Sequence, residues 1–422
     1  MSRERVHVLI AGAGLQGSCI ALELARLGIR VALLDQDTQP MNRASLRNEG
    51  KIHLGLIYAN DRTFQSARLQ LSGALRFRRL LQRWIGRGAD RLRTSTSFIY
   101  LVARDSVLDP DALAHHYARV EEEYRVQCGS DPELDYLGTR PARLAQRLSG
   151  IPQEFAADFF QAAFATPELA IDTDQLAKLI RRALRDSPLV DFLGAHCVRA
   201  IQSGDGLSVE GDGPNGSFVI NADQVVNVTW ERRSALDRGM GLAPSPDLLH
   251  RLKYRVLVRV PPEMKRGPSA TMVLGRYGDV VIRPEGLSYL SWYPTGMRGW
   301  TSEIEPPRAW DEACRGTPAA GIAREVGRLA LRYIDEWYPG IAKSTIAVVD
   351  AGVIVAVGRT DVDDAGSALH YRSGIGMTSL DNYHTVDPGK MTTAPLFALE
   401  AAKRVAARAG QRQTDRIEQR KN

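Results

Sequence analysis

Cysteine is scarce in this chain, and the cysteines that are present are far apart. The 422 residues include four of them, and no two form a Cys-x-x-Cys pair. Neither a zinc site nor a disulfide framework is indicated, so we expect no metal and a reducing, cytoplasmic location.

No stretch approaches the ~20 apolar residues of a membrane-spanning helix. Even the apolar residues 346–358 are interrupted by Asp350, so we expect no integral membrane segment.

Clusters of like charge are also scarce. The formal net charge is +6, but Lys and Arg are scattered along the chain except in residues 411–422, which read as a basic tail. No nucleic-acid motif accompanies this charge, so we expect no nucleic-acid partner. A small acidic substrate, attracted by a positive cleft, is compatible with the same balance.

The N-terminal residues read as a βαβ unit. Residues 6–11 are an apolar run without helical spacing, which is typical of a strand buried in a parallel sheet. Residues 19–27 carry helix formers, and Gly28 ends that helix. Residues 30–34 form a second apolar strand. The order strand, turn, helix, strand is the one that a dinucleotide-binding unit requires.

The turn of this unit carries the glycine pattern GAGLQG. Gly12 permits a tight turn, Gly14 lets the backbone approach a pyrophosphate, and Gly17 allows close packing of the helix. The phosphates of a nucleotide would lie at the helix N-terminus, and Asp35 could accept hydrogen bonds from the ribose hydroxyls. The unit predicts a dinucleotide but does not distinguish NAD from FAD.

The segment after the second strand, residues 43–58, has the sequence RASLRNEGKIHLGLIY. It resembles the D-amino-acid oxidase / glycerol-3-phosphate dehydrogenase superfamily of FAD enzymes, in particular its 2-hydroxyglutarate-oxidase-like members. The matching positions are Ile52, His53, Gly55 and Tyr58. The resemblance implies that Arg43, Ser45 and Asn48 lie along the pyrophosphate and ribityl chain and that His53 lies beside the flavin ring. The alternative for His53 is a purely structural histidine in a glycine-rich turn.

A second block resembles the same superfamily. Residues 164–174 precede a helical stretch and two strands, at residues 198–201 and 222–229. The resemblance implies that the backbone amide of Val198 reaches the adenine, while Asp172 and Asp174 read as helix caps. The block departs from the family at one place, because Trp230, Glu231 and Arg232 stand where the family has a small Ala-x-Gly run.

The third block, residues 374–395, precedes a clear helix at residues 396–407. In the family this helix points its N-terminus at the flavin, and the backbone amides implied here are those of Gly389, Lys390, Met391 and Thr392. A helix N-terminus there favours the negatively charged, reduced flavin. Lys390 would add a full charge, unless it is an ordinary surface lysine. The resemblance of the His53 segment and of the Gly389–Pro395 loop to the family's flavin-bracketing segments implies that the cofactor is FAD.

The resemblance implies an α/β fold in which a Rossmann-like FAD-binding domain of the glutathione-reductase type is interleaved with an α+β substrate domain. The FAD-binding domain is expected at residues 1–88, 146–235 and 345–422, and the substrate domain at residues 89–145 and 236–344. An antiparallel sheet of the substrate domain is expected from strands at residues 95–102, 254–260, 271–275, 278–282 and 288–293, with helices at residues 111–125 and 318–337.

Substrates of this superfamily commonly present a carboxylate, which a guanidinium can hold in a bidentate pair. The arginines expected to do so are Arg283, Arg359 and Arg372, and Tyr293 and Trp292 are candidate aromatic walls. The implied reaction moves a hydride from a carbon bearing a hydroxyl or amine to flavin N5. An alcohol needs a base, for which His53 and His384 are the candidates, and their presence favours a 2-hydroxy acid or another alcohol.

We see no second unit in which such a glycine pattern joins a strand to a helix, so an internal NAD(P)H domain is not expected. Electrons are expected to pass to oxygen, a quinone or a partner protein. Two alternatives stay open at this point. One is a flavin monooxygenase of a biosynthetic pathway, although the Gly-Asp-Ala turn usual before its last helix is absent. The other is a flavin-binding protein without turnover.

Overall fold

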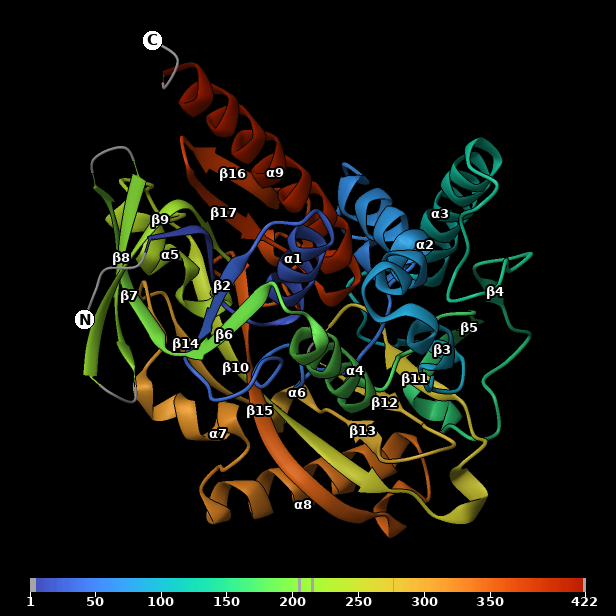
Figure 1. The fold of residues 1–422 in the computed structure, drawn as a ribbon. Coiled ribbons are helices and arrows are strands. Elements are labelled where there is room, and N and C mark those ends of the chain that lie inside the picture. The colour runs from blue at the N-terminus through green and yellow to red at the C-terminus, as the bar shows by residue number, and fades with distance from the viewer. Residues whose placement is uncertain (1–4, 204–205, 214–215, 276, 420–422) are drawn as a thin grey trace.

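The fold consists of two β-sheets with helices packed around them (Figure 1). The computed structural model describes residues 5–203, 206–213, 216–275 and 277–419, without the side chains of residues 197–198 and 410–419. The first sheet contains β1 (Arg5–Ala11), β2 (Val31–Asp35), β6 (Val190–Gly194), β7 (His196–Ser203), β8 (Gly206–Gly213), β9 (Gly216–Asn227), β16 (Gly376–Leu380) and β17 (Tyr383–Asp387).

Parallel strands in the order β17-β9-β1-β2-β6 form the centre of the first sheet. The turn after β1 shows why its glycines are needed. Gly12 has φ +105°, and a Cβ there would lie 2.5 Å from the carbonyl oxygen of Val228 at the end of β9. A Cβ on Gly17 would lie 1.9 Å from the carbonyl oxygen of Gly12. The expected βαβ unit is confirmed, and its turn leaves no room for a side chain at Gly12 or Gly17.

The second sheet has the order β14-β10-β13-β12-β11-β3-β5-β4, and β15 pairs with the other side of β10. It contains β3 (Phe98–Ala103), β4 (Gln146–Arg147), β5 (Phe160–Ala165), β10 (Leu248–Arg259), β11 (Ser269–Met272), β12 (Asp279–Val281), β13 (Ser288–Leu290), β14 (Met297–Thr301) and β15 (Thr345–Val357). The pairs are antiparallel except for β11 with β3. This sheet is the one expected for the substrate domain.

The two sheets divide the chain differently from the expected boundaries. β4 and β5, within residues 146–235, and β15, within residues 345–422, were allotted to the FAD-binding domain, yet all three belong to the second sheet. The apolar run of β15 fits either sheet equally well. Its assignment depends on a long-range register with β10, from Leu248 opposite Val357 to Arg259 opposite Thr345, which the local sequence does not encode.

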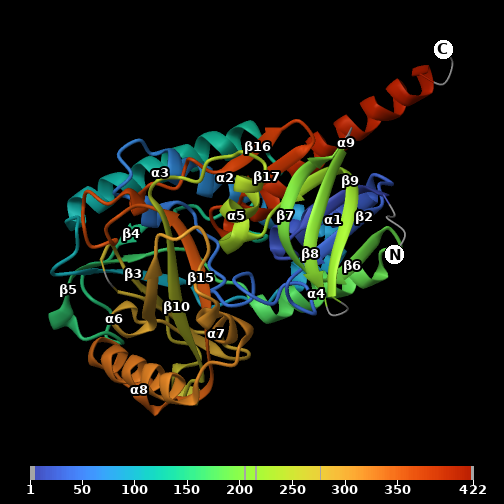
Figure 2. The ribbon, with the colours of Figure 1, turned by 90° about the vertical axis from the view of Figure 1, so that its left-hand side faces the viewer.

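Helices cover the two sheets separately (Figures 1 and 2). They are α1 (Leu15–Arg26), α2 (Gln65–Ile85), α3 (Pro110–Ser130), α4 (Thr173–Asp186), α5 (Arg233–Gly239), α6 (Tyr293–Gly296), α7 (Asp311–Arg315), α8 (Ala320–Trp337) and α9 (Ala394–Gln419). α8 packs on β10 and β15 through an apolar core that includes Ile334 and Trp337. Of the two expected caps, Asp172 caps α4 by accepting from the backbone N–H groups of Asp174 and Gln175, whereas Asp174 lies inside the first turn of the helix.

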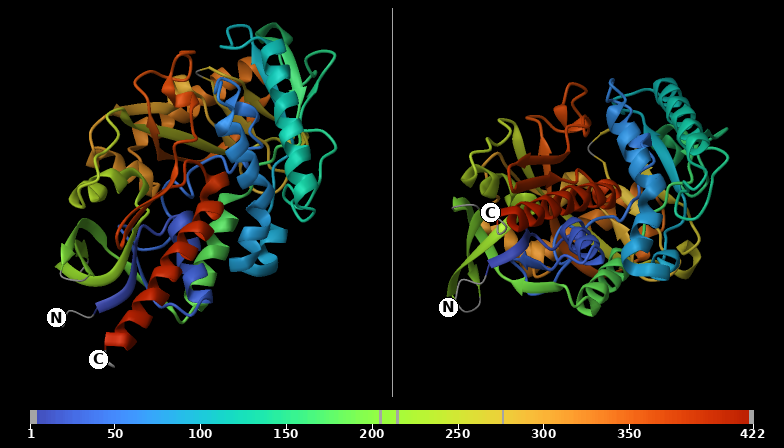
Figure 3. Two further views of the ribbon diagram at one scale, coloured as in Figure 1. Left: turned by 90° about the horizontal axis from the view of Figure 1, so that it is seen from above. Right: turned by 45° about the horizontal axis from the view of Figure 1, so that its top comes forward.

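The C-terminal helix α9 runs beside α1 and α2, next to the first sheet (Figure 3). Its first residue, Ala394, follows a single 3₁₀ turn at Met391–Thr393. This places the start of the last helix at the carboxyl ends of β1 and β9, where open parallel sheets bind their ligands. Among the described residues, no helix is both long and apolar enough to cross a membrane.

Candidate active site

A continuous set of three cavities runs between the two sheets. The outer cavity is lined by Gly12, Asp35 and Arg43, among others, and it shares Gly14, Ser45 and Trp230 with the middle cavity. The middle cavity shares Glu49, His53, Tyr293, Arg372 and Lys390 with the inner cavity. A long ligand could therefore extend from the glycine turn of the first sheet to the face of the second.

The outer cavity has the features that a nucleotide needs. Asp35 accepts a hydrogen bond from the backbone N–H of Ala13 at 2.7 Å, and its burial raises the pKa of its carboxyl to about 6. Ser45 Oγ accepts from the N–H of Leu15 at 2.9 Å, and a Cβ on Gly14 would lie 2.9 Å from that same oxygen. The glycine therefore leaves open a cradle at the start of α1, where free N–H groups favour a pyrophosphate.

Two more of the predicted cofactor-binding residues, Arg43 and Asn48, line the outer and the middle cavity. Arg43 lines the outer cavity and donates from Nε to Glu231 at 2.8 Å and from Nη2 to Asp311 at 2.7 Å. Asn48 lines the middle cavity, where its side chain ties the loop together through the carbonyl oxygens of Ala44 and Ser45. Val198 lies in β7, and its side chain is outside the described residues.

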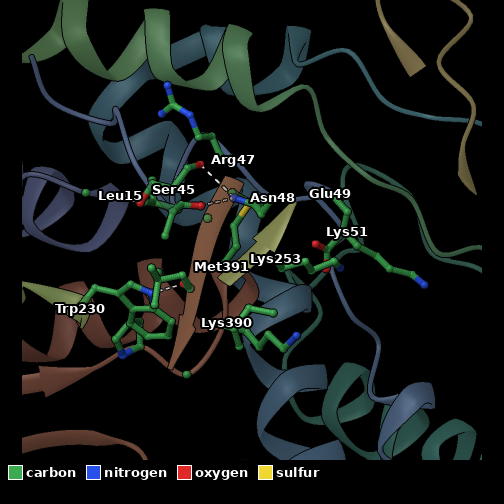
Figure 4. Close-up of a pocket in the computed structure, with 18 of the residues that line it drawn as sticks. Leu15, Ser45, Arg47, Asn48, Glu49, Lys51, Trp230, Lys253, Lys390 and Met391 are labelled. Carbon is green, nitrogen blue, oxygen red and sulfur yellow. Dashed lines mark hydrogen bonds between the residues drawn. The ribbon is translucent and has the colours of Figure 1, made fainter. Parts of the chain in front are cut away.

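Two segments far apart in the sequence meet at the middle cavity. The backbone N–H of His53 donates to Thr392 Oγ1 at 3.0 Å, and both residues are buried. Gly389, Lys390 and Met391 line the same cavity (Figure 4). The structure thus brings together the two segments that the resemblance places on either side of a flavin ring.

Charged side chains gather where the middle and inner cavities join. His53 Nε2 lies 3.9 Å from Glu49 Oε1, and His53 Nδ1 is buried without a hydrogen-bond partner among the described residues. Burial, together with the charges of Lys390 and Lys51, lowers the pKa of His53 well below its usual value, so the imidazole is neutral. Burial alone would raise the pKa of Glu49, but the charges of Lys253 and Lys390 lower it to about 2, so Glu49 is a carboxylate.

The structure separates the predicted catalytic residues into two groups. His53, Arg372 and Tyr293 line both the middle and the inner cavity. Arg283 does not line either one, and its guanidinium donates to the backbone oxygens of Leu287, Glu49 and Ile171. His384 lies within β17 and is hydrogen-bonded to Gln224 and Ser379, away from the cavities.

Arg359 also lies apart from the site: its side chain is exposed on the surface, where it pairs with Asp247. The proposed catalytic set therefore omits Arg283, His384 and Arg359. Arg283 and His384 instead make hydrogen bonds to other groups of the protein.

Sequence reasoning missed the basic face of β10. Arg251 lines the inner cavity, whereas Lys253 and Arg255 line the middle one. Arg251 pairs with Asp361 and Arg255 with Asp350, while the Lys253 ammonium lies 4.6 Å from the Tyr293 ring centroid. Basic residues at every second position of an otherwise apolar strand are the signal that could have identified this face.

The fold and the cavities define a class of protein: a dinucleotide-binding sheet faces a second sheet that closes a charged cavity. The family described as FAD dependent oxidoreductase (DAO) matches residues 7–376. The chain belongs to this family, and it is an FAD-dependent oxidoreductase. Two features fit the cofactor: the space left beside Gly14, and the buried His53, whose Nδ1 has no hydrogen-bond partner among the described residues.

Solved structures share the fold at low sequence identity. Glycine oxidase from Geobacillus kaustophilus is 16% identical, with 96% of this chain and 95% of that chain covered and a TM-score of 0.67. L-proline dehydrogenase from P. horikoshii is 14% identical, with coverages of 96% and 92% and a TM-score of 0.63. L-alpha-glycerophosphate oxidase from Mycoplasma pneumoniae, a structure with FAD bound, is 15% identical, with coverages of 95% and 94% and a TM-score of 0.61. No curated protein matches the chain.

Thr392→Val tests the bond that joins the two segments of the middle cavity. The buried N–H of His53 would lose its acceptor, which costs about 1–3 kcal/mol. We expect a lower free energy of unfolding by that amount and weaker FAD binding, measured by denaturant titration and by fluorescence titration of the apoprotein. Thr392→Ser keeps the hydroxyl and should behave as the wild type. Equal losses in both variants would contradict this role of the hydroxyl.

Proposed function

We propose that this enzyme oxidises a small carboxylate-bearing substrate by removing hydride from a carbon that bears a hydroxyl or an amine. The observation that carries the proposal is the junction of the middle and inner cavities, where a neutral His53 faces the same space as Arg372 and Lys390. The 2-hydroxyglutarate-oxidase-like resemblance of residues 43–58 and the names of the structural neighbours support substrates of this kind.

Arg372 and Lys390 are the residues that would hold the substrate's carboxylate. The Arg372 guanidinium donates to the carbonyl oxygen of Val355 at 2.9 Å, which fixes its orientation. Within the described part of the chain, neither side chain has a carboxylate within ion-pair distance. A guanidinium and an ammonium without such a partner favour an anion in the cavity beside them. Tyr293 would line the cavity on the same side.

His53 would take the proton of a substrate hydroxyl. FAD, when bound, supplies the hydride acceptor at flavin N5. The neutral imidazole can accept a proton as the hydride leaves, and the Glu49 carboxylate at 3.9 Å would stabilise the imidazolium that forms. An amine with a free lone pair needs this help much less. His53 would therefore matter more for a hydroxy acid than for an amino acid.

The electron acceptor is part of the same proposal. Oxygen, a quinone or a partner protein would reoxidise the flavin. The other Gly-x-Gly-x-x-Gly pattern of the sequence, at residues 211–216, has its glycines in the antiparallel strands β8 and β9 and not at the start of a helix, so it does not support an NAD(P)H site. A cytoplasmic location is proposed because the chain has few cysteines and no Cys-x-x-Cys pair.

The test of this function is anaerobic mixing of the FAD-loaded protein with 2-hydroxy acids, including 2-hydroxyglutarate, with amino acids and with secondary amines. We expect one of these classes to bleach the flavin absorbance. Arg372→Met should weaken substrate binding on the order of 10–100-fold, because a charge-assisted hydrogen bond contributes about 1.5–3 kcal/mol. Bleaching by NADPH alone, with none by the panel, would instead indicate a monooxygenase.

His53→Ala should slow flavin reduction on the order of 10²–10⁴-fold for a hydroxy acid, because general-base catalysis contributes that much. The variant should keep its yellow colour. His115→Ala, at an exposed position of α3, is the matched control and should reduce at the wild-type rate. Stopped-flow absorbance measures both. Release of FAD by His53→Ala would show a binding role instead.

Lys390 gives the reaction a pH dependence. Burial lowers the pKa of Lys390 from its ordinary value to about 8; Glu49 opposes this change, while Arg372 and Lys253 add to it. Lys390 is therefore cationic below about pH 8 and loses its charge above it. We expect the dissociation constant of an anionic substrate to rise about tenfold per pH unit above that pKa, as for binding to one protonated group.

Lys390→Arg is the control for this pH profile. Arginine keeps its charge throughout the range, so binding by this variant should stay nearly constant up to pH values where the wild type has weakened. The measurement is the substrate concentration dependence of flavin reduction at each pH. The same rise in both proteins would show that another group titrates.

A further inference from the structure

The segment Trp230-Glu231-Arg232, here called the WER segment, is the place where the sequence departs from its family. It forms a single 3₁₀ turn directly after β9. All three residues line the outer cavity, and Trp230 also lines the middle cavity. A departure in sequence therefore falls at the junction of the two cavities that would hold the halves of FAD.

Trp230 occupies a backbone conformation that bulky residues rarely adopt. Its φ is +54°, in the left-handed region that favours glycine. The conformation is held from outside the segment, because the indole Nε1 donates to the carbonyl oxygen of Val353 in β15 at 2.8 Å. In Figure 4, Trp230 lies on the opposite side of the drawn pocket from Glu49 and Lys51. Such strain is kept where the surrounding structure imposes it, often at a ligand site.

Glu231 and Arg232 are also tied to other segments. Glu231 accepts from Arg43 at 2.8 Å, and Arg232 donates to Glu305 at 2.8 Å. Asp311 joins the two arginines, since it accepts from Arg43 at 2.7 Å and lies 3.6 Å from Arg232. Glu305 and Asp311 follow β14 of the second sheet. The wall of the outer cavity is thus held in place by the other half of the protein.

Two donors in this cluster are left open. Arg43 Nη1 and Arg232 Nε are buried, and neither has a hydrogen-bond partner among the described residues. Buried guanidinium N–H groups normally have acceptors. Both arginines line the outer cavity, so the oxygens of a nucleotide there would satisfy these donors.

We propose that the WER segment is an additional FAD-binding element. Trp230 forms the wall between the two halves of the cofactor, and Arg43 and Arg232 donate to the ADP half. Asp311 and Val353 are positioning residues, through which the second sheet keeps the segment closed over the nucleotide. The proposal concerns how FAD is retained, so it does not depend on the proposed substrate.

The test is the rate at which the purified FAD-loaded protein releases FAD, followed by the rise in flavin fluorescence. Trp230→Gly removes the wall and accepts the positive φ without strain, and Asp311→Asn keeps the shape of the side chain but removes its charge. We expect each variant to release FAD about tenfold faster or more. Glu325→Gln, which breaks the ion pair of α8 with Arg298, is the matched control and should release FAD at the wild-type rate.

A second measurement separates cofactor binding from folding. Each variant is melted with and without FAD, and the FAD-dependent rise in melting temperature should be smaller in Trp230→Gly and Asp311→Asn than in the wild type. Trp230→Phe keeps a ring but loses the bond to Val353, so its release rate should be intermediate. Wild-type release and an undiminished FAD-dependent rise in both variants would overturn the proposal. A normal Asp311→Asn beside a defective Trp230→Gly would overturn the role of the second sheet.

Discussion

The hydrogen bond from the His53 N–H to Thr392 Oγ1 closes the middle cavity and fixes its shape. It joins positions 339 residues apart, so it can form only when the long-range packing is complete. β1 and β9 must lie parallel, and α9 must run beside α1 and α2, before the loop ahead of α9 reaches the His53 segment. The bond is buried, and an unmet N–H there would be costly. The position of the residues proposed to face the flavin therefore depends on the whole first sheet.

A second constraint comes from charge. Lys253, Lys390 and Arg372 line the middle and inner cavities together with the carboxylates Glu49 and Asp279, so cationic side chains outnumber carboxylates there. This excess keeps Glu49 ionised and His53 neutral, which are the states that the proposed chemistry needs. The same charge supports the proposal of an anionic substrate, since buried cations without counter-ions are unfavourable. Binding and catalysis thus depend on the same electrostatic balance.

The parts of the fold that sequence could predict are those with local causes. The turn was predictable because its glycine pattern is local, and at Gly17 the cause is local too, since a Cβ there would meet the carbonyl oxygen of Gly12. Asp172 was predictable as a cap because capping is decided within three residues. β5 and β15 were assigned to the FAD-binding domain, although both pair within the second sheet, because the sequence of an apolar strand does not indicate which sheet it joins. His384 was chosen for its chemistry within a matching block, and Arg283 for its chemistry at the end of a strand, yet both side chains make internal hydrogen bonds.

The same argument explains why the basic face of β10 and the WER segment escaped notice as parts of the site. In β10, Arg251 and Lys253 are separated by an apolar residue, and only the pairing with β15 and β14 decides which face meets the cavities. In the sequence, Trp230 is a bulky residue at a position where the family has small residues. The structure shows that its bond to Val353 holds it there. A residue that seems to break a local rule is therefore best judged by the distant partner that keeps it in place.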